Sequence, residues 1–413
     1  MTIIYFLLMM IPIVIIHELG HFYIGKWSGI KPEVFSVGFG PELWSKVAKD
    51  GTKWRVAAFP LGGYVKFADD ANGTNFPNLD TSKPSYLARF GAKIATLLAG
   101  PFANFLLSMI LFFIYATSFG LQSDQATLQK IHFVENEIVA GDKIIAVDGT
   151  YVKNIEDVYT ATENIQSPNV DAKVERNGAE LVMTLPNPYR AIVVGVDPKM
   201  PAFKAGIRPG DEIVKFADVD IYNFKQVIDT IDGRGLEPID VSVIREGAPM
   251  TLTLTPIASD DPETLGQPRM GVQFGGFYET AHERLGPVDA SKYAVSSTIW
   301  ILTASFEGIR DLVTGKVGLD AMSGPVGIGR MAADSAENGF WNFVFMMGMM
   351  SSAIGFLNLL PLPILDGGHL VIMVYEKIIG KLPPQKLLNG LFALGFALLL
   401  GLMLVTTVRD LFG

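Results

Sequence analysis

The chain has no cysteine and few histidines. Its 413 residues include only five of the latter: His17, His21, His132, His282 and His369. Without thiols the protein cannot form disulfides, zinc–thiolate or iron–sulfur sites, or a cysteine nucleophile. Any metal ion must therefore be held by His, Asp or Glu. The chain also lacks Lys- or Arg-rich blocks, and its net charge of −9 argues against nucleic acid as a partner.

Apolar residues are gathered into long runs, although 18% of the chain is charged. Segments at about 94–117, 341–365 and 388–408 are long enough to cross a bilayer, which takes about 20 apolar residues. A fourth segment, 3–24, is apolar up to Ile16 and polar after it. It has no Lys or Arg before the apolar run and no small-residue cleavage site after it. We therefore interpret it as a retained membrane helix, not a signal peptide.

The charges between these segments predict their orientation. Residues 25–93 hold ten Lys or Arg against six Asp or Glu, whereas residues 118–342 hold 19 against 32. Basic residues near the ends of membrane helices mark the cytoplasmic side. We expect the segments 25–93 and 366–387 on that side. With four crossings, the middle region and both termini are expected on the outer side.

Two related passages lie in the middle region, at 138–158 and 202–227. Each places a Gly-Asp turn before an alternating apolar strand, and the two are about 69 residues apart. They predict two domains, at 119–187 and 188–258. The second passage resembles a PDZ domain, a module that binds an extended peptide at a sheet edge. The alternative is a scaffold or size filter that binds no peptide.

Two further segments have the composition of membrane-associated structure. Residues 31–67 read as two apolar strands with glycine-rich turns, and they predict a β-hairpin that dips into the membrane. An ordinary amphipathic hairpin on the surface is the alternative. Residues 290–313, within an outer segment 259–340, have helical periodicity but carry charges. We expect them to form an amphipathic helix and not a fifth span.

The strongest chemical signal is the sequence HELGH at residues 17–21. On a helix, His17 and His21 lie one turn apart on one face, so both imidazoles can reach one metal ion. Glu18, beside the first of them, can act as a base. Ionisable side chains at the end of an apolar helix are costly, which points to function. The alternative is that they only mark the cytoplasmic end of the helix.

A catalytic zinc usually has three protein ligands, so one more is needed. Asp366, which we expect at the end of the 341–365 helix, is the best candidate, and His369 is the rival. Asn358 precedes two helix-breaking prolines and can hydrogen-bond an unwound substrate, or it can serve only in helix packing. The sequence thus predicts a zinc site with Glu18 as the catalytic base.

Several motifs occur in order along nearly the whole chain. They are HELGH, GFG, FPLGGYVKF, AGPFAN (99–104), SGPVGI (323–328) and NLLPLPILDGGH (358–369). Together they resemble the site-2 protease family of intramembrane zinc metalloproteases. The resemblance implies that His17, His21 and Asp366 bind zinc and that Glu18 is catalytic.

The resemblance also implies a substrate site and a place in the cell. Asn358, Pro361, Gly38 and Gly40 would handle the substrate, a single-span membrane protein already trimmed outside the bilayer. An anti-sigma factor of the envelope stress response, or a remnant signal peptide, is the class that it suggests. The protein would lie in a bacterial inner membrane, with PDZ-like domains and both termini in the periplasm and the active site near the cytoplasmic face.

The expected fold is therefore a polytopic α-helical membrane protein with about four transmembrane helices, a membrane-associated β-hairpin and two extracytoplasmic PDZ-like α+β domains. The parts are an N-terminal membrane part (1–118), the outer segments, and a C-terminal membrane part (341–413). Three other functions fit some of these features: a membrane PDZ receptor with a structural metal, a transporter, and an enzyme for soluble substrates. A structural zinc has four protein ligands, and His369 could supply the fourth.

Overall fold

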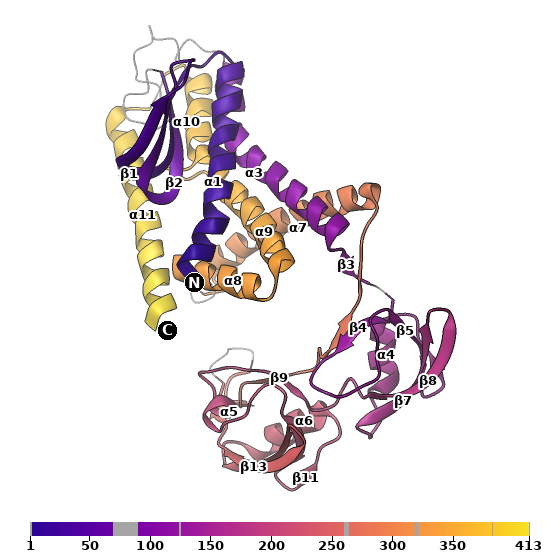
Figure 1. Ribbon diagram of the computed structural model, residues 1–413. Helices are drawn as coiled ribbons and strands as arrows, with labels where there is room; N and C mark the ends of the chain where they lie inside the picture. Colours follow the sequence, from indigo (N-terminus) through magenta and orange to yellow (C-terminus); the bar gives the residue numbers. More distant parts are fainter. Residues whose placement is uncertain are drawn as a thin grey trace. The chain divides into compact units, whose positions relative to one another are not determined.

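The computed structural model describes residues 2–68, 90–123, 125–259, 264–318, 322–381 and 383–412. The chain divides into two compact units. Unit 1 comprises Met1–Gly120 with Arg284–Gly413, and unit 2 comprises Leu121–Glu283. Unit 1 is largely helical and unit 2 is built from small sheets (Figure 1).

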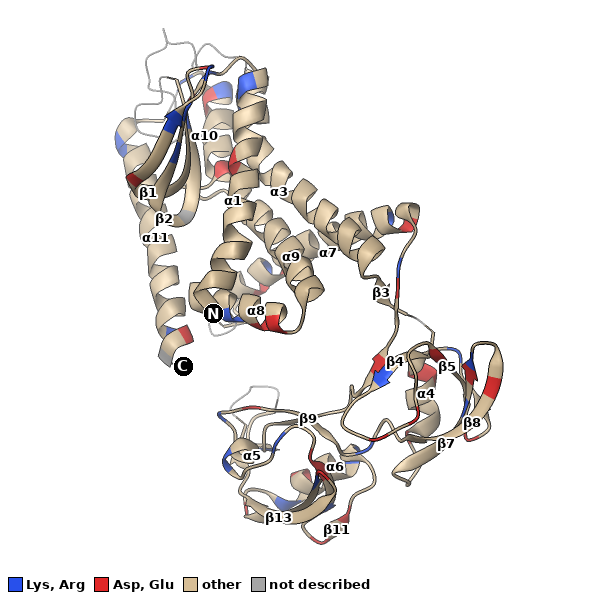
Figure 2. Ribbon diagram, in the orientation of Figure 1, with Lys and Arg blue, Asp and Glu red and all other residues tan. Residues whose placement is uncertain are grey.

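Unit 1 contains the long apolar helices. Its described helices are α1 (Thr2–Trp27), α3 (Phe90–Ser118), α7 (Pro287–Val313), α8 (Pro325–Glu337), α9 (Phe340–Asn358), α10 (Asp366–Ile379) and α11 (Gln385–Phe412). Among the described residues, α1, α3, α9 and α11 are long and apolar enough to cross a membrane. Few charged residues lie along these four helices (Figure 2). The prediction of four spans is confirmed, and the protein is a polytopic membrane protein.

The predicted span at 341–365 is wrong in its second part. Helix α9 ends at Asn358, and α10 begins at Asp366 after a loop. Pro361 and Pro363 lack the N–H groups that a continuing helix needs, so the chain turns there. Asp366 therefore opens the next helix and does not close the previous one. The segment 366–387, which is expected on the cytoplasmic side, contains helix α10, and one face of this helix is buried.

Helix α3 lies at the centre of unit 1 and packs on α1, α7 and α9. The helix expected at 290–313 is present as α7. Its buried residues recur about every fourth position along one face: Ala290, Ala294, Thr298 and Ile301. Ala294 and Ile301 of this stripe pack in one cluster with the buried ring of Phe112 from α3. The prediction of an amphipathic helix is confirmed, because its other side stays exposed.

Both ends of the described chain meet the short helix α8. A side chain on Gly329 would touch Thr2, so the absence of Cβ allows α1 to approach. At the other end, the backbone N–H of Gly327 donates to Asp410 Oδ2 at 2.6 Å. Gly327 of the SGPVGI motif and Gly329 just after it therefore serve close packing, because a Cβ on Gly327 would crowd Asp410 and one on Gly329 would crowd Thr2. The two termini lie at one end of unit 1, as an even number of crossings requires (Figure 1).

Strands β1 (Pro32–Val47) and β2 (Lys53–Phe67) pair antiparallel in unit 1. Each strand bends, so that Phe35 near the start of β1 lies opposite both Trp54 and Val65 of β2. Phe22 of α1 packs with Phe35 and Val65 in a buried cluster. The sheet is therefore fastened to the helix that carries the HELGH sequence.

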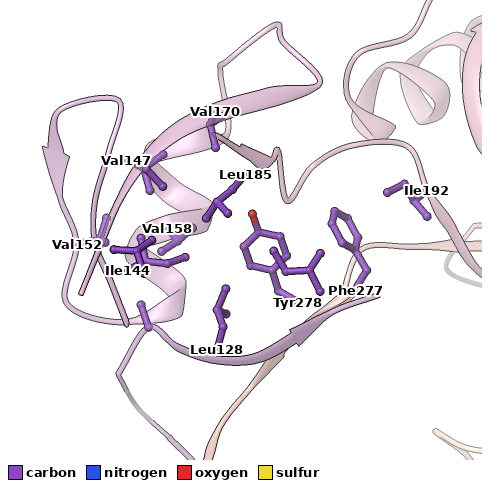
Figure 3. Packing of buried hydrophobic residues seen from close by; sticks show 14 residues of the cluster. Leu128, Ile144, Val147, Val152, Val158, Val170, Leu185, Ile192, Phe277 and Tyr278 are labelled. Carbon is purple, nitrogen blue, oxygen red and sulfur yellow. The ribbon is translucent and has the colours of Figure 1, made fainter. Parts of the chain in front are cut away.

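The described residues of unit 2 form two larger sheets, each with a helix and a core of its own, and three two-stranded sheets. Its helices are α4 (Ile155–Thr162), α5 (Pro201–Lys204) and α6 (Phe224–Arg234). Its strands are β3 (Leu121–Gln122), β4 (Thr127–Ile131), β5 (Asp142–Val147), β6 (Thr150–Tyr151), β7 (Asn169–Arg176), β8 (Ala179–Pro186), β9 (Val193–Val196), β10 (Glu212–Phe216), β11 (Val219–Asp220), β12 (Ile239–Arg245), β13 (Ala248–Leu254), β14 (Ile257–Ala258), β15 (Pro268–Arg269), β16 (Val272–Phe274), β17 (Tyr278–Thr280) and β18 (His282–Glu283). The larger sheets have the orders β17-β4-β5-β7-β8 and β11-β10-β12-β13. Figure 3 shows the core of the first, where side chains from several strands and α4 converge.

The two halves of unit 2 repeat the same local structure 69 residues apart, as predicted. Asp142 follows a Gly turn and forms an ion pair with Arg176, at 2.6 Å. Asp211 follows the corresponding turn and forms an ion pair with Arg245, at 2.7 Å. Both acids are buried, so in each half the arginine compensates a charge that burial would otherwise make costly.

The boundary expected at residue 258 differs from the structure. Strand β16 pairs with β9, and β17 pairs with β4 at the edge of the first sheet. Tyr278 of β17 enters the first core, and its hydroxyl donates to the carbonyl of Pro186 at 2.5 Å. The residues after 258 therefore complete both halves of unit 2, and only those from Arg284 onward belong to unit 1.

Candidate metal centre

The side chains of the HELGH sequence lie on the buried part of α1. His17, Glu18 and His21 are all buried, and the Nε2 atoms of the two imidazoles are 3.2 Å apart. The helix brings them together because residues four apart lie one turn above each other. Polar groups so deep in an apolar helix need partners within the protein.

Asp366 of α10 reaches both imidazoles. Its Oδ2 atom is 3.2 Å from His17 Nε2 and 3.4 Å from His21 Nε2. The first turn of α10 packs directly on the preceding loop: any side chain on Gly367 would collide with the carbonyl of Leu359, and any on Gly368 with that of Leu362. The glycines after Asp366 therefore allow the carboxylate to stand at this position.

These three atoms fit a zinc ion. Ligands at about 2.0–2.1 Å from a tetrahedral centre lie about 3.3–3.4 Å from each other, and the three measured separations agree with that. Within the part of the chain that the structure describes, the buried Oδ2 of Asp366 has no hydrogen-bond donor. Two imidazoles and one carboxylate are also a donor set typical of catalytic zinc, which keeps a fourth position open. Within the described residues, these are the His, Asp and Glu side chains that could share one ion.

Residues of helix α3 contact both imidazoles. The Nδ1 atom of His21 donates to the carbonyl of Thr96 at 2.7 Å, which leaves Nε2 with a lone pair for a metal. Gly100, one turn further, lies against both rings, and a side chain there would collide with His21. Asn104, another turn on, has Nδ2 at 3.3 Å from His17 Nδ1.

Glu18 lies between the two imidazoles in sequence and borders strand β2. Its Cγ would touch a Cβ on Gly63, so this glycine lets the strand pass close to the carboxylate. Glu18 lines the same cavity as the three candidate ligands. A carboxylate in that place can exchange a proton with a group bound in the cavity.

The cavity has a volume of about 480 Å³. Its lining residues are His17, Glu18, His21, Phe39, Gly63, Tyr64, Asn358, Ile364, Asp366, His369, Phe392 and Phe396. They come from α1, both hairpin strands, the end of α9, the following loop and α10, and α11. The wall of the cavity thus combines apolar side chains, part of a β-strand and the polar groups of the candidate site.

The predicted substrate residues are not all at this cavity. Asn358 lines it, but Pro361 is exposed and does not. Gly38 and Gly40 flank Phe39, which does line it, and their positive φ angles of 88° and 87° allow β1 to bend there. His369 lines the cavity, yet its nitrogens are outside the group of atoms that could share one ion.

Sequence reasoning missed the residues that surround the ligands. Tyr64 and Phe396 line the cavity, and the sequence analysis assigns a role to neither, although Tyr64 lies within the FPLGGYVKF motif. Thr96, Gly100 and Asn104 contact the imidazoles, and their spacing of four along an apolar helix was a signal that could have identified them.

Comparison with known proteins agrees with this geometry. The chain matches peptidase family M50 over residues 5–402. A predicted zinc metalloprotease of Agrobacterium fabrum is 30% identical over 98% of this chain and 94% of its own length. A similar protein of Rhizobium meliloti is 29% identical over 98% and 95%. Protease RseP of Yersinia pestis is 27% identical over 96% and 95%.

The fold and the site thus define a membrane-embedded metalloprotease. The chain belongs to peptidase family M50, the site-2 proteases, because the match covers nearly all of it. It is a zinc metalloprotease, and the family and cofactor expected from the sequence motifs are confirmed.

Proposed function

We propose that the protein cleaves single-span membrane proteins at the buried site formed by His17, Glu18, His21 and Asp366. The observation that carries the proposal is the convergence of three ligand atoms beside Glu18, inside a bundle of apolar helices. A site at this depth is reached most directly by a substrate that is itself in the bilayer. The expected site is therefore an intramembrane one.

The residues divide the chemistry between them. His17, His21 and Asp366 hold zinc, which when bound polarises a peptide carbonyl and lowers the pKa of water. Glu18 accepts the proton of the attacking water and passes it to the leaving nitrogen. The buried surroundings keep Glu18 close to the reacting group and exclude bulk solvent.

A membrane helix must unwind before it can be cut, because its carbonyls are hydrogen-bonded within the helix. Gly63 and Tyr64 of β2 line the cavity, so the substrate can pair with this strand and regain backbone hydrogen bonds. Asn358 donates its amide N–H to the carbonyl of Ile354 at 3.0 Å, which leaves its oxygen for a substrate N–H. Gly38, Gly40 and Pro361 act indirectly, by shaping the β1 bend at Phe39 and the loop before α10.

We place the protein in a bacterial inner membrane, with the hairpin and α10 toward the cytoplasm and unit 2 in the periplasm. The excess of basic residues in 25–93 supports this orientation. At about 1.5 Å per residue, His17 lies roughly 20 Å along α1 from its first turn, toward the hairpin side. The substrate class proposed is an anti-sigma factor already trimmed outside the membrane, with remnant signal peptides as a second class. The support for both is the likeness to site-2 proteases.

The experiment that tests the proposal uses the purified protein in liposomes with a fluorescent single-span substrate. We expect cleavage that stops when a zinc chelator is added and returns with zinc. A soluble peptide of the same sequence serves as the matched substrate, and we expect it to be cut far more slowly. Equal rates on both would support an enzyme for soluble substrates. Tightly retained zinc without any cleavage would support a receptor with a structural metal.

The outer repeats add a second, binding function to the proposal. A groove of about 560 Å³ in the second half of unit 2 is lined by Phe224, Ile228 and Ile231 of α6 on one side and by residues 267–274 on the other. Within the described residues, β16 pairs only with β9, so its other edge is open to a further strand. These features support the PDZ-like assignment. We propose that the groove takes an extended peptide with apolar side chains at alternate positions.

This proposal predicts the effect of a charge in the groove. Ile228 is 45% exposed and lines the groove, so Ile228→Glu should weaken binding of a fluorescein-labelled peptide of alternating Val and Ser by about tenfold or more. Asp229→Ala, at an exposed neighbouring position outside the groove, is the matched control and should bind as the wild type does. If the wild-type chain binds no such peptide in polarisation measurements, the groove is a scaffold surface.

A further inference from the structure

Asn104 of α3 lies beside the metal centre and has an incomplete set of hydrogen bonds. Its side chain is fully buried, with 0% of the residue exposed. Its Nδ2 lies 3.3 Å from His17 Nδ1, while its Oδ1 has no hydrogen-bond donor among the described residues. A buried amide oxygen without a donor is costly, so this arrangement calls for a physical reason.

The hydrogen on His17 decides which end of the amide must face the ring. If Nδ2 donates to Nδ1, the neutral imidazole carries its hydrogen on Nε2. That Nε2 is the atom that lies 3.2 Å from Asp366 Oδ2 and 3.2 Å from His21 Nε2. A nitrogen that carries a hydrogen cannot be a metal ligand, so this orientation is incompatible with the zinc site.

The opposite orientation resolves both conflicts at once. The two ends of an amide have nearly the same shape, and a half-turn about the Cβ–Cγ bond exchanges them. Oδ1 then faces His17, accepts the hydrogen of Nδ1 and acquires the donor that it lacked. Nε2 of His17 is left with its lone pair toward the metal. Metal-binding histidines almost always donate their other N–H to such an acceptor.

In this orientation, helix α3 supplies a hydrogen-bond acceptor to the Nδ1–H of each of the two histidines. The carbonyl of Thr96 accepts the Nδ1–H of His21, and two turns later Asn104 stands in the same relation to His17, with Gly100 making room between them. The position of Asn104 is fixed from the other side by α9. The hydroxyl of Ser351 donates to the backbone carbonyl of Asn104 at 2.8 Å, and Gly355 lies against the Cβ of Asn104.

We infer that Asn104 is a positioning residue whose side-chain oxygen holds His17 in the tautomer and orientation that bind zinc. The inference rests on the proposed ligand role of His17. It makes zinc affinity, and not only catalysis, depend on a residue that does not touch the metal.

The test measures the zinc dissociation constant of the full chain in detergent by competition with a chromophoric chelator. Asn104→Leu keeps the approximate volume and removes the acceptor, and it should weaken zinc binding by about 10- to 100-fold. Asn104→Asp keeps an oxygen acceptor and should bind zinc close to the wild-type affinity. Ser108→Ala is the matched control. Ser108 is also buried on α3, one turn on, but its hydroxyl contacts Ser352 and Thr298, so zinc affinity should not change.

Equal affinity of Asn104→Leu and wild type would overturn the inference, and so would an equal loss in Ser108→Ala. Nitrogen-15 NMR of histidine-labelled wild-type protein without metal gives a second measurement that needs no variant at Asn104. We expect His17 to carry its hydrogen on Nδ1, and a hydrogen on Nε2 would contradict the inference. If His17→Ala retains zinc at wild-type affinity, the proposed ligand set fails instead, which distinguishes the two failures.

Discussion

Replacing Glu18 with glutamine is expected to abolish cleavage while the protein keeps its fold and its zinc. Glutamine has nearly the same shape, so it fits the space that Glu18 occupies against Gly63. It cannot accept a proton from water, however, and general base catalysis contributes about 10²- to 10⁴-fold to a rate. We therefore expect the rate on a single-span substrate to fall by at least about 10²-fold.

The measurement compares cleavage in liposomes with the zinc content of the same samples. Glu307→Gln, at an exposed position of α7, changes the charge by the same amount away from the site and should leave the rate unchanged. A Glu18→Gln protein that cleaves at the normal rate would show that Glu18 is not the base. A variant that loses its zinc as well would show that the side chain has a structural part in holding the metal.

Replacing Asp366 with asparagine is expected to weaken zinc retention strongly, whereas the same change at His369 should not. Asp366 Oδ2 stands at ligand distance from both imidazoles, and its negative charge offsets that of the ion in an apolar interior. A neutral amide supplies neither the charge nor an equally strong donor. Loss of a residue that only hydrogen-bonds a metal ligand weakens metal affinity by about 10- to 100-fold. Loss of a ligand itself should therefore weaken zinc affinity by at least about 100-fold.

His369→Asn is the matched comparison for this experiment. His369 is buried in the same cavity, three residues further along α10, and its ring lies 5.6 Å from that of Phe392 on α11. Zinc stoichiometry after dialysis against a graded series of chelator concentrations separates the two variants. If Asp366→Asn keeps its zinc and His369→Asn loses it, the third ligand is His369. If both lose it, the site is closed by four protein ligands and the structural-metal alternative gains support.

The sequence predicted the two halves of the candidate site separately. The HELGH spacing alone places His17 and His21 on one helical face, since four residues make about one turn. The two prolines after Asn358 indicate a break, but the apolar composition continues to Leu365, so the helix predicted over 341–365 extends beyond the end of α9 at Asn358. The apolar loop from Leu359 to Leu365 has the composition of a membrane helix, and only its packing against Gly367 and Gly368 shows that it is a turn.

In unit 2, too, the sequence predicted a local feature, the Gly-Asp turns, but not the distant strands that pack with it. The repeat of 69 residues was visible because each turn precedes an alternating strand, but the strands that complete the two halves were not. Strand β17 is three residues long, and its partner β4 lies about 150 residues earlier in the chain. So short a strand has no periodicity of its own and is defined by its partner.

By itself, the sequence determined what depends on neighbours along the chain: four apolar helices, two imidazoles one turn apart, and a repeated strand and turn. The tertiary structure alone decided that Asp366 meets those imidazoles, that α3 presents Thr96, Gly100 and Asn104 to them, and that a strand of the hairpin borders Glu18. The physical reason is that the ligand atoms of a metal site must lie about 3.3 Å from each other. Here they come from α1 and α10, which are hundreds of residues apart in the sequence. Local periodicity sets which face of a helix is polar, and packing sets what that face meets.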